Sequence, residues 1–232
     1  MPQIESNLRY ASPSVIRGFW DAWAPEWAIH EPIGPKVLTA VRRFTSERLD
    51  RVSGNNRFLD LCSGADYAAY YPSEITPAMV SAMDISPGML ALNSAGDKKV
   101  ADVKDGIPYP ENSFDAVTIF FGWSHLTYRN SRWETSYSRD NVYYLYKSVL
   151  GNISKVLQPN GLLLVVDAAD AFMQSSGPRE FHADELAIIA SGIGFRYTSH
   201  GNIYHSEVPS GIYPGAIAET TIDYMSCHKA KK

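Results

Sequence analysis

The stretch Phe58–Tyr71, FLDLCSGADYAAYY, decides how the rest of the chain is interpreted. The apolar run Arg57–Leu61 predicts a short strand, and a loop of small residues with one glycine, Gly64, follows it. In open α/β sheets, ligands bind beyond the carboxyl ends of the strands, where the strand order reverses. We therefore expect this loop to belong to a ligand site.

The alternation of strand and helix continues along the chain, which indicates a parallel sheet in an α/β fold. Helical spacing separates the strand patterns, and a turn signal, Pro159-Asn160-Gly161, precedes the fifth strand. The last two strand patterns predict an antiparallel pair at the sheet edge. Further strands are predicted at Met79–Ile85, Lys99–Ala101, Ala116–Phe121, Leu162–Val166, Phe195–Tyr204 and Thr220–His228, and helices at Ser86–Ser94, Val142–Val156 and Asp184–Ala190.

The N-terminal region, residues 12–53, has a helical pattern. Trp20, Trp23 and Trp27 fall on one helical face, which Pro25 is expected to interrupt. An amphipathic pattern continues after Pro35. We predict one domain over residues 1–232, in which a helical cap (1–53) precedes a Rossmann-like core (54–228).

Composition narrows the class of protein. The chain has 232 residues, a net charge of −4 and 45% hydrophobic residues, which fits one globular domain without a broad basic surface for nucleic acid. Cys62 and Cys227 are too few and too far apart for a disulfide framework or a metal cluster, so we expect reduced thiols and no metal site. No apolar run approaches the roughly 20 residues of a membrane span, and the N-terminus does not read as a signal peptide. A cytoplasmic protein without a membrane partner is expected.

The loop chemistry disfavours a dinucleotide, because a pyrophosphate needs a glycine-rich turn and the charge of Asp66 would repel it. A nucleoside without phosphate fits better. Asp84, 24 residues beyond Asp60, can accept both ribose hydroxyls, and Asp102 can accept from an adenine amino group. S-adenosylmethionine meets these conditions, since its sulfonium and ammonium tolerate acidic neighbours and Gly64 allows one close backbone approach.

Four segments in this order resemble the class I S-adenosylmethionine-dependent methyltransferases, in their small-molecule branch. The resemblance implies a Rossmann-like three-layer sandwich, a seven-stranded and mostly parallel sheet with an antiparallel last strand, and S-adenosylmethionine as methyl donor. The segments that carry it are FLDLCSGAD, AMDISPGML, DVKDGIPYPENSFDAVTIFFGWSHL and ISKVLQPNGLLLVVD, with a closing hairpin from GFRYTSHGNIYHS onward.

The same resemblance assigns the cofactor contacts. The methionine end falls to Asp60 and Gly64, the ribose to Asp84, and the adenine edge to Asp102 and Val103. Cys62 stands where the family's first glycine usually is. Asp66 stands at the third, where it would pair with the cofactor's ammonium or a substrate amine, or else crowd the carboxylate. The full set of implied cofactor residues is Asp60, Cys62, Gly64, Asp84, Ile85, Met89, Asp102, Val103 and Phe120.

The segment after the fourth strand supplies the expected reaction site. His125 is placed to act as general base on an acceptor hydroxyl or amine, although a histidine here can also have no chemical role. Between residues 127 and 146, six of twenty residues are aromatic, which predicts either an aromatic cover over the active site or core packing. Substrate contacts are predicted for Trp20, Asp66, Trp123, Tyr128 and Trp133.

These features predict methyl transfer to a small aromatic or hydrophobic molecule, of the kind met in secondary metabolism. Two other classes stay open: an enzyme of cyclisation or rearrangement on the same cofactor scaffold, and a non-catalytic partner subunit. We expect a small-molecule substrate, no nucleic-acid partner, and a monomer or homodimer.

Overall fold

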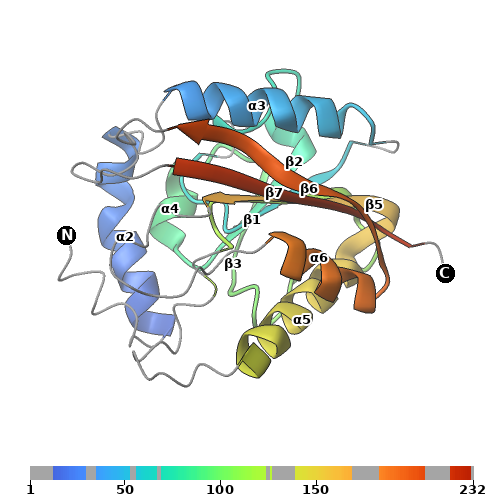
Figure 1. Ribbon diagram of the computed structural model, residues 1–232. Coiled ribbons are helices and arrows are strands. Elements are labelled where there is room, and N and C mark those ends of the chain that lie inside the picture. The colour runs from blue at the N-terminus through green and yellow to red at the C-terminus, as the bar shows by residue number, and fades with distance from the viewer. Residues whose placement is uncertain are drawn as a thin grey trace.

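In the computed structural model, residues 13–29, 35–52, 56–66, 69–123, 126, 139–168, 183–206 and 220–230 are described. These residues form a seven-stranded sheet in the order β3-β2-β1-β4-β5-β7-β6, with helices on both faces (Figure 1). Within this sheet β7 runs antiparallel to both of its neighbours, while the other pairs are parallel. The predicted fold class, a Rossmann-like sandwich whose last strand is antiparallel, is confirmed.

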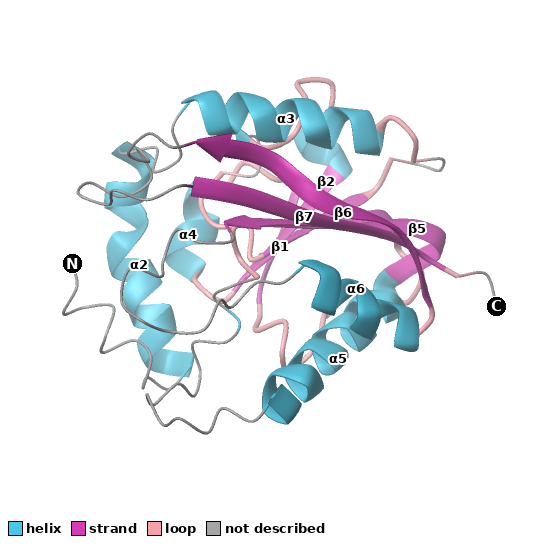
Figure 2. Cartoon of the chain, viewed as in Figure 1, coloured by secondary structure: helices cyan, strands magenta, loops and turns pink. Residues whose placement is uncertain are grey.

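The strands lie within about five residues of their predicted places. Figure 2 shows them in magenta, with helices in cyan. The two strands at the centre, residues 58–61 and 114–120, are buried along their whole length, as parallel strands covered on both faces should be. The strands are β1 (Phe58–Leu61), β2 (Val80–Asp84), β3 (Asp97–Val100), β4 (Phe114–Phe120), β5 (Leu157–Ala168), β6 (Phe195–Ser206) and β7 (Thr220–Lys229), and the helices are α2 (Pro13–Ile29), α3 (Pro35–Leu49), α4 (Pro87–Leu92), α5 (Arg139–Val156) and α6 (Ala183–Gly192).

Helices from distant parts of the sequence cover the two faces of the sheet (Figure 1). On one face α3 packs Val37 and Val41 against a cluster that includes Phe58. On the other face α5 packs Leu150 against a cluster that includes Leu59, the next residue along β1. Successive strand residues therefore feed opposite core clusters, as the period of two requires. In the described ranges no helix is long and apolar enough to cross a membrane.

The expected interruption at Pro25 is wrong, because α2 continues through it to Ile29. Proline has no N–H for the carbonyl four residues earlier, which here is that of Asp21. The helix persists because it is held by packing: Ala24 is buried against α4 and the loop after β1. Tertiary contacts have overridden a local rule of helix formation.

The connection from β1 to β2 lacks the usual α-helix in its described part, residues 69–79. Turns and a short 3-10 helix, η2 (Pro77–Met79), replace it. The prolines at 72 and 77 account for this, since each disfavours helix at the residue before it. The sheet face above β1 and β2 is covered by α3 instead.

The turn at residues 159–161 is part of a bulge within β5. Leu157 lies opposite Phe114 and Leu162 opposite Ala116, so the β5 side has the extra residues. Asn160 has a φ of 64°, and a Cβ at Gly161 would lie 2.9 Å from the carbonyl oxygen of Gln158. Asparagine and glycine are the residues that tolerate such positions.

Candidate active site

The candidate site lies beyond the carboxyl ends of β1 and β4. The strand β2 pairs with one edge of β1, and β3 lies beyond β2. The chain then returns, so that β4 pairs with the other edge of β1. The strand order therefore reverses between β1 and β4, where α/β folds bind their ligands. The loop after β1, residues 62–66, and the loop after β4, beginning at Phe121, meet at this point.

Both loops begin with a residue in the left-handed region of φ. Cys62 has a φ of 54° and Phe121 a φ of 55°, although neither is glycine. A bulky residue at positive φ is uncommon and occurs where surrounding structure holds it in place. Gly122 supplies part of that structure, because a Cβ on it would lie 2.5 Å from the Cβ of Cys62. The two loops are thus packed at the closest distance that their side chains permit.

The carboxylate of Asp84 joins the loops after β1 and β2. One oxygen accepts the backbone N–H of Gly64 at 3.0 Å, and the other accepts that of Ser86 at 2.8 Å. Burial raises the pKa of Asp84, while these amide hydrogen bonds act in the opposite direction. The predicted ribose residue and the glycine of the opening loop are therefore brought into direct contact.

Asn93 holds the same loop from the other side, and the sequence reasoning missed it. Its buried amide nitrogen donates to the carbonyl oxygen of Gly64 at 3.0 Å, and its side-chain oxygen accepts from the N–H of Ala95 at 2.9 Å. Nothing local to the sequence marks it beyond its place after a short helix. Gly64 itself has a φ of 57°, so it needs glycine for its conformation.

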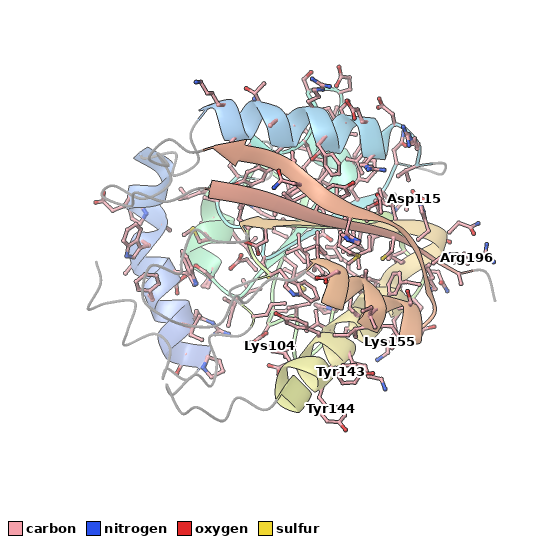
Figure 3. The ribbon with its side chains drawn as sticks, in the orientation of Figure 1. Lys104, Asp115, Tyr143, Tyr144, Lys155 and Arg196 are labelled. Atoms are coloured by element: carbon pink, nitrogen blue, oxygen red, sulfur yellow. The ribbon has the colours of Figure 1, made fainter. Side chains whose placement is uncertain are left out.

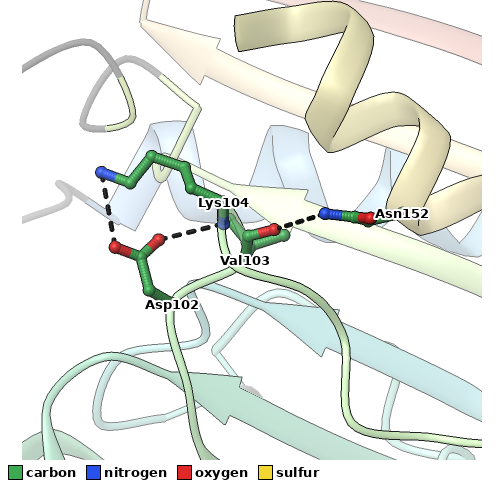
Figure 4. Close-up of polar contacts among 4 residues, drawn as sticks. All are labelled: Asp102, Val103, Lys104 and Asn152. Atoms are coloured by element: carbon green, nitrogen blue, oxygen red, sulfur yellow. Dashed lines mark hydrogen bonds and ion pairs between the residues drawn. The ribbon is translucent and has the colours of Figure 1, made fainter.

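Asp102 follows β3, as predicted for the adenine edge, and Figure 4 shows its surroundings. One carboxylate oxygen accepts the N–H of Lys104 at 3.0 Å, and the other lies 3.6 Å from the Lys104 ammonium. Both side chains are more than nine-tenths buried. Val103 is buried, and its carbonyl oxygen accepts from Asn152 of α5 at 3.1 Å. Lys104 and Asn152 were not foreseen, because both contacts depend on how the loop folds.

A buried polar chain runs from β1 to the segment after it. The Thr118 hydroxyl donates to Asp60 at 2.7 Å and lies 2.5 Å from the hydroxyl of Tyr71. The second carboxylate oxygen of Asp60 is buried and has no hydrogen-bond partner within the described parts of the chain. Burial raises the pKa of Asp60 to about 8, and the negative charges of Asp84 and Asp66 add to the effect. Asp60 therefore holds a proton close to neutral pH.

An aromatic cluster stands at the end of β4. Tyr70 stacks on Phe120, with ring centroids 5.0 Å apart, and lies 5.5 Å from Phe121. Phe120, a predicted cofactor residue, is buried on the α3 face, and Tyr71 meets its ring edge-on. Aromatic rings arranged in this way hold one another in fixed orientations.

The predicted substrate residue Trp123 lies in the core. Its side chain is fully buried, and its ring centroid is 5.0 Å from that of Tyr146 in α5. Tyr143 and Tyr144 of the same helix are 43% and 65% exposed and lie at its outer end (Figure 3). The described part of the aromatic-rich segment, residues 139–146, is thus divided between core packing and solvent.

The remaining predicted residues fall into three groups. Asp66 is exposed and does not have a positive φ, so its backbone does not require glycine. Trp20 and Met89 pack together with Ala65 beneath α2, and Ile85 is half-buried beside Asp84. His125, Tyr128 and Trp133 lie outside the described residues. Among the described residues, no group of histidine, cysteine or acidic side chains could hold a metal ion.

Gly122→Ala should weaken binding of S-adenosylmethionine by at least about tenfold, because the added methyl group displaces Cys62 and the loop that carries Gly64. Isothermal titration calorimetry measures this. Gly151→Ala in α5 is the matched control, since nothing lies within 4 Å of its added Cβ. The double variant Cys62→Gly/Gly122→Ala removes the clash and should recover affinity. Unchanged binding by Gly122→Ala alone would contradict the loop contact.

The pKa of Asp60 predicts how stability depends on pH. The folded protein keeps a proton up to about pH 8 that an unfolded aspartate, with a pKa of 3.8, has released. The free energy of unfolding should therefore fall as pH rises from about 4 to about 8. Asp60→Asn, which is neutral throughout, should flatten that slope. Urea unfolding at several pH values tests this, and equal slopes for the two proteins would rule it out.

Comparison with known proteins finds similarity to methyltransferases. A methyltransferase domain family matches residues 59–165. A ubiquinone/menaquinone biosynthesis C-methyltransferase of Pseudomonas putida is 28% identical over 137 residues, which are 54% of this chain and 46% of that protein. A demethylmenaquinone methyltransferase of Listeria monocytogenes is 31% identical over 135 residues, 53% of this chain and 48% of the relative. The aligned part spans about half the length of these curated relatives.

Solved structures share the fold over nearly the whole chain. The cyclase SpnF has a TM-score of 0.67 at 13% identity, with 96% of this chain and 98% of that one covered. A SAM-dependent methyltransferase from Aquifex aeolicus has a TM-score of 0.53 at 16% identity, with 95% and 100% covered. Residues 59–165 thus match a methyltransferase domain, and the chain has a fold that S-adenosylmethionine-dependent methyltransferases adopt.

Proposed function

We propose that this protein transfers the methyl group of S-adenosylmethionine to a small aromatic or hydrophobic molecule. The observation that carries the proposal is the contact between Asp84 and Gly64 at the switch point of the sheet. It brings the carboxylate that suits a ribose to the loop that suits the amino-acid end of the cofactor. Asp102 stands at the end of the neighbouring strand, β3.

The residues present fit such a cofactor. Asp84 would hold the ribose, Asp102 and Val103 the adenine, and Asp60 with Gly64 the methionine end. The second carboxylate oxygen of Asp60, which has no hydrogen-bond partner among the described residues, could accept from the cofactor's ammonium once Asp60 is ionised. The acidic surroundings suit a sulfonium and an ammonium and would repel phosphate. When bound, the cofactor supplies an activated methyl group, and the chain's part is to position the acceptor and exclude water.

The acceptor is proposed to be a flat ring. Tyr70, Phe120 and Phe121 form an aromatic cluster at the carboxyl end of β4, in which Tyr70 and Phe121 are half-buried and Phe120 is buried. The half-buried rings would favour planar, apolar molecules by stacking and by exclusion of water. One relative is named as a C-methyltransferase of ubiquinone/menaquinone biosynthesis and another as a demethylmenaquinone methyltransferase, and these names support an acceptor of this shape.

His125 is the proposed general base where the acceptor must lose a proton. It follows β4 by five residues, in Gly122-Trp123-Ser124-His125, and so comes from the loop that closes against the cofactor loop. Asp66, which is exposed, is proposed to face the ammonium or a substrate amine. Trp20, Tyr128 and Trp133 remain proposed substrate contacts, with residues 127–146 over the site.

Cyclisation or rearrangement is a second candidate. The cyclase SpnF covers nearly all of both chains, with a TM-score of 0.67 against 0.53 for the Aquifex methyltransferase. The likeness is one of fold, and it shows that a scaffold of this shape holds an enzyme of another class. Conversion of an acceptor without formation of S-adenosylhomocysteine would favour this candidate.

We also propose a cytoplasmic protein of secondary metabolism, acting as a monomer or homodimer on a small molecule. Free thiols at Cys62 and Cys227 support a reducing compartment. The net charge of −4 supports the absence of a nucleic-acid partner.

Asp84→Asn should reduce affinity for S-adenosylmethionine by about 10- to 100-fold, because hydrogen bonds to a charged group contribute about 1.5–3 kcal/mol. Calorimetric titration with S-adenosylmethionine and S-adenosylhomocysteine measures it. Asp50→Asn, an exposed residue after α3, is the control and should bind as the wild type does. Absence of binding to the wild-type chain would overturn the proposed function.

His125→Ala should lower turnover by about 10²-fold or more if the histidine is the base, with cofactor affinity unchanged. The assay is formation of S-adenosylhomocysteine with a panel of phenols and hydroquinones as acceptors. A pH series distinguishes a general base from a histidine without a chemical role. Loss of the base also removes the fall in turnover rate at low pH. Wild-type turnover by the variant would remove His125 from the mechanism.

A further inference from the structure

One oxygen atom of Asp21, in α2, accepts two hydrogen bonds from the start of α4. Asp21 Oδ1 accepts the hydroxyl of Ser86 at 2.6 Å and the backbone N–H of Gly88 at 2.8 Å. The Ser86 hydroxyl in turn accepts the N–H of Met89 at 3.0 Å. Figure 1 shows α2 alongside α4, away from the helices that cover the faces of the sheet. A residue of the N-terminal helix thus caps α4, which begins three residues after Asp84.

The contact is fitted closely. A Cβ on Gly88 would lie 2.9 Å from Asp21 Oδ1 and 3.1 Å from its Cα, so the two backbones approach only because residue 88 is glycine. Ala24, one turn further along α2, is buried with Ala65 and Met89. The helix therefore rests on both the cofactor loop and α4. Pro25 has no N–H for the carbonyl of Asp21, so the helix is already altered where it meets α4.

Ser86 links Asp21 to Asp84, the residue proposed to hold the ribose. Ser86 donates its hydroxyl to Asp21 and its backbone N–H to Asp84. Asp84 accepts the N–H of Gly64 with its other oxygen. Ser86 is fully buried, so water cannot replace the bond that Asp21 makes to it. A shift of α2 would move Ser86 and with it the orientation of the Asp84 carboxylate.

We propose that Asp21 is a positioning residue for the cofactor: by holding Ser86 and Gly88 it orients Asp84 toward the ribose. The inference rests on the proposed function, because it assigns a further residue to the same site. It joins the N-terminal helix to the binding of the cofactor. The docking of α2 then becomes a condition for tight binding, in addition to any cover that the helix provides.

The test compares Asp21→Ala with Asp21→Asn. Both hydrogen bonds use the same oxygen, so the amide oxygen of asparagine can replace it while alanine cannot. Calorimetry with S-adenosylhomocysteine should show at least about a tenfold loss for Asp21→Ala and a loss within about threefold for Asp21→Asn. Glu26→Gln, an exposed acid on the same helix, should bind as the wild type does. Thermal unfolding of each protein is measured alongside.

The outcomes separate the two proposals. If the wild type binds S-adenosylhomocysteine and Asp21→Ala binds it equally well but unfolds at a lower temperature, Asp21 only anchors the helix and the inference is overturned. Equal losses for alanine and asparagine would also overturn it, since the shared oxygen would then not matter. If the wild type does not bind, the proposed function itself fails. Should Asp21→Ala not fold, Asp21→Glu displaces the same oxygen with the charge retained, and normal binding by it would overturn the inference.

Discussion

The hydrogen bonds that Asp84 accepts from Gly64 and Ser86 are the constraint on which the rest of the site depends. Parallel strands end side by side, and the loops that leave them carry backbone N–H groups with no partner in the sheet. One carboxylate accepts from two such loops, and hydrogen bonds to a charged acceptor are stronger than neutral ones. Asn93 then fixes the carbonyl of Gly64, and α2 reaches the same point through Ser86. The chain's own groups therefore hold the loops together.

The electrostatics of the site favour a cation. Asp60 lies buried near the charges of Asp84 and Asp66, and these raise its pKa in addition to the effect of burial. Protonation of Asp60 relieves this repulsion. A bound ammonium or sulfonium would relieve it directly and allow the proton to leave. The same acidic surroundings that disfavour a phosphate therefore suit the cationic groups of S-adenosylmethionine.

The sequence predicted the framework because the framework is local. The apolar run of β1, the spacing from Asp60 to Asp84 and the acid after β3 are all readable along the chain. The contacts of Asp21, Asn93 and Lys104 were not, because each depends on which segments the fold brings together. At Pro25 the local rule for proline predicted an interruption of the helix, but packing keeps α2 continuous to Ile29. Trp123 was predicted to contact the substrate, but its side chain is fully buried and packs against Tyr146 of α5.

The difference between local and long-range contacts also explains how the loop at residues 62–66 can form with one glycine, where such loops usually have three. Glycine is needed for two separate reasons, a positive φ and a close approach of neighbouring backbone. Gly64 meets the first at its own position, with a φ of 57°. At Cys62 the chain adopts positive φ without glycine, and the room for its side chain comes from Gly122 in the loop after β4. Asp66 needs neither, since its φ is not positive and it is exposed. Close approach is a property of two loops, so counting glycines in one of them underestimates what the pair can hold.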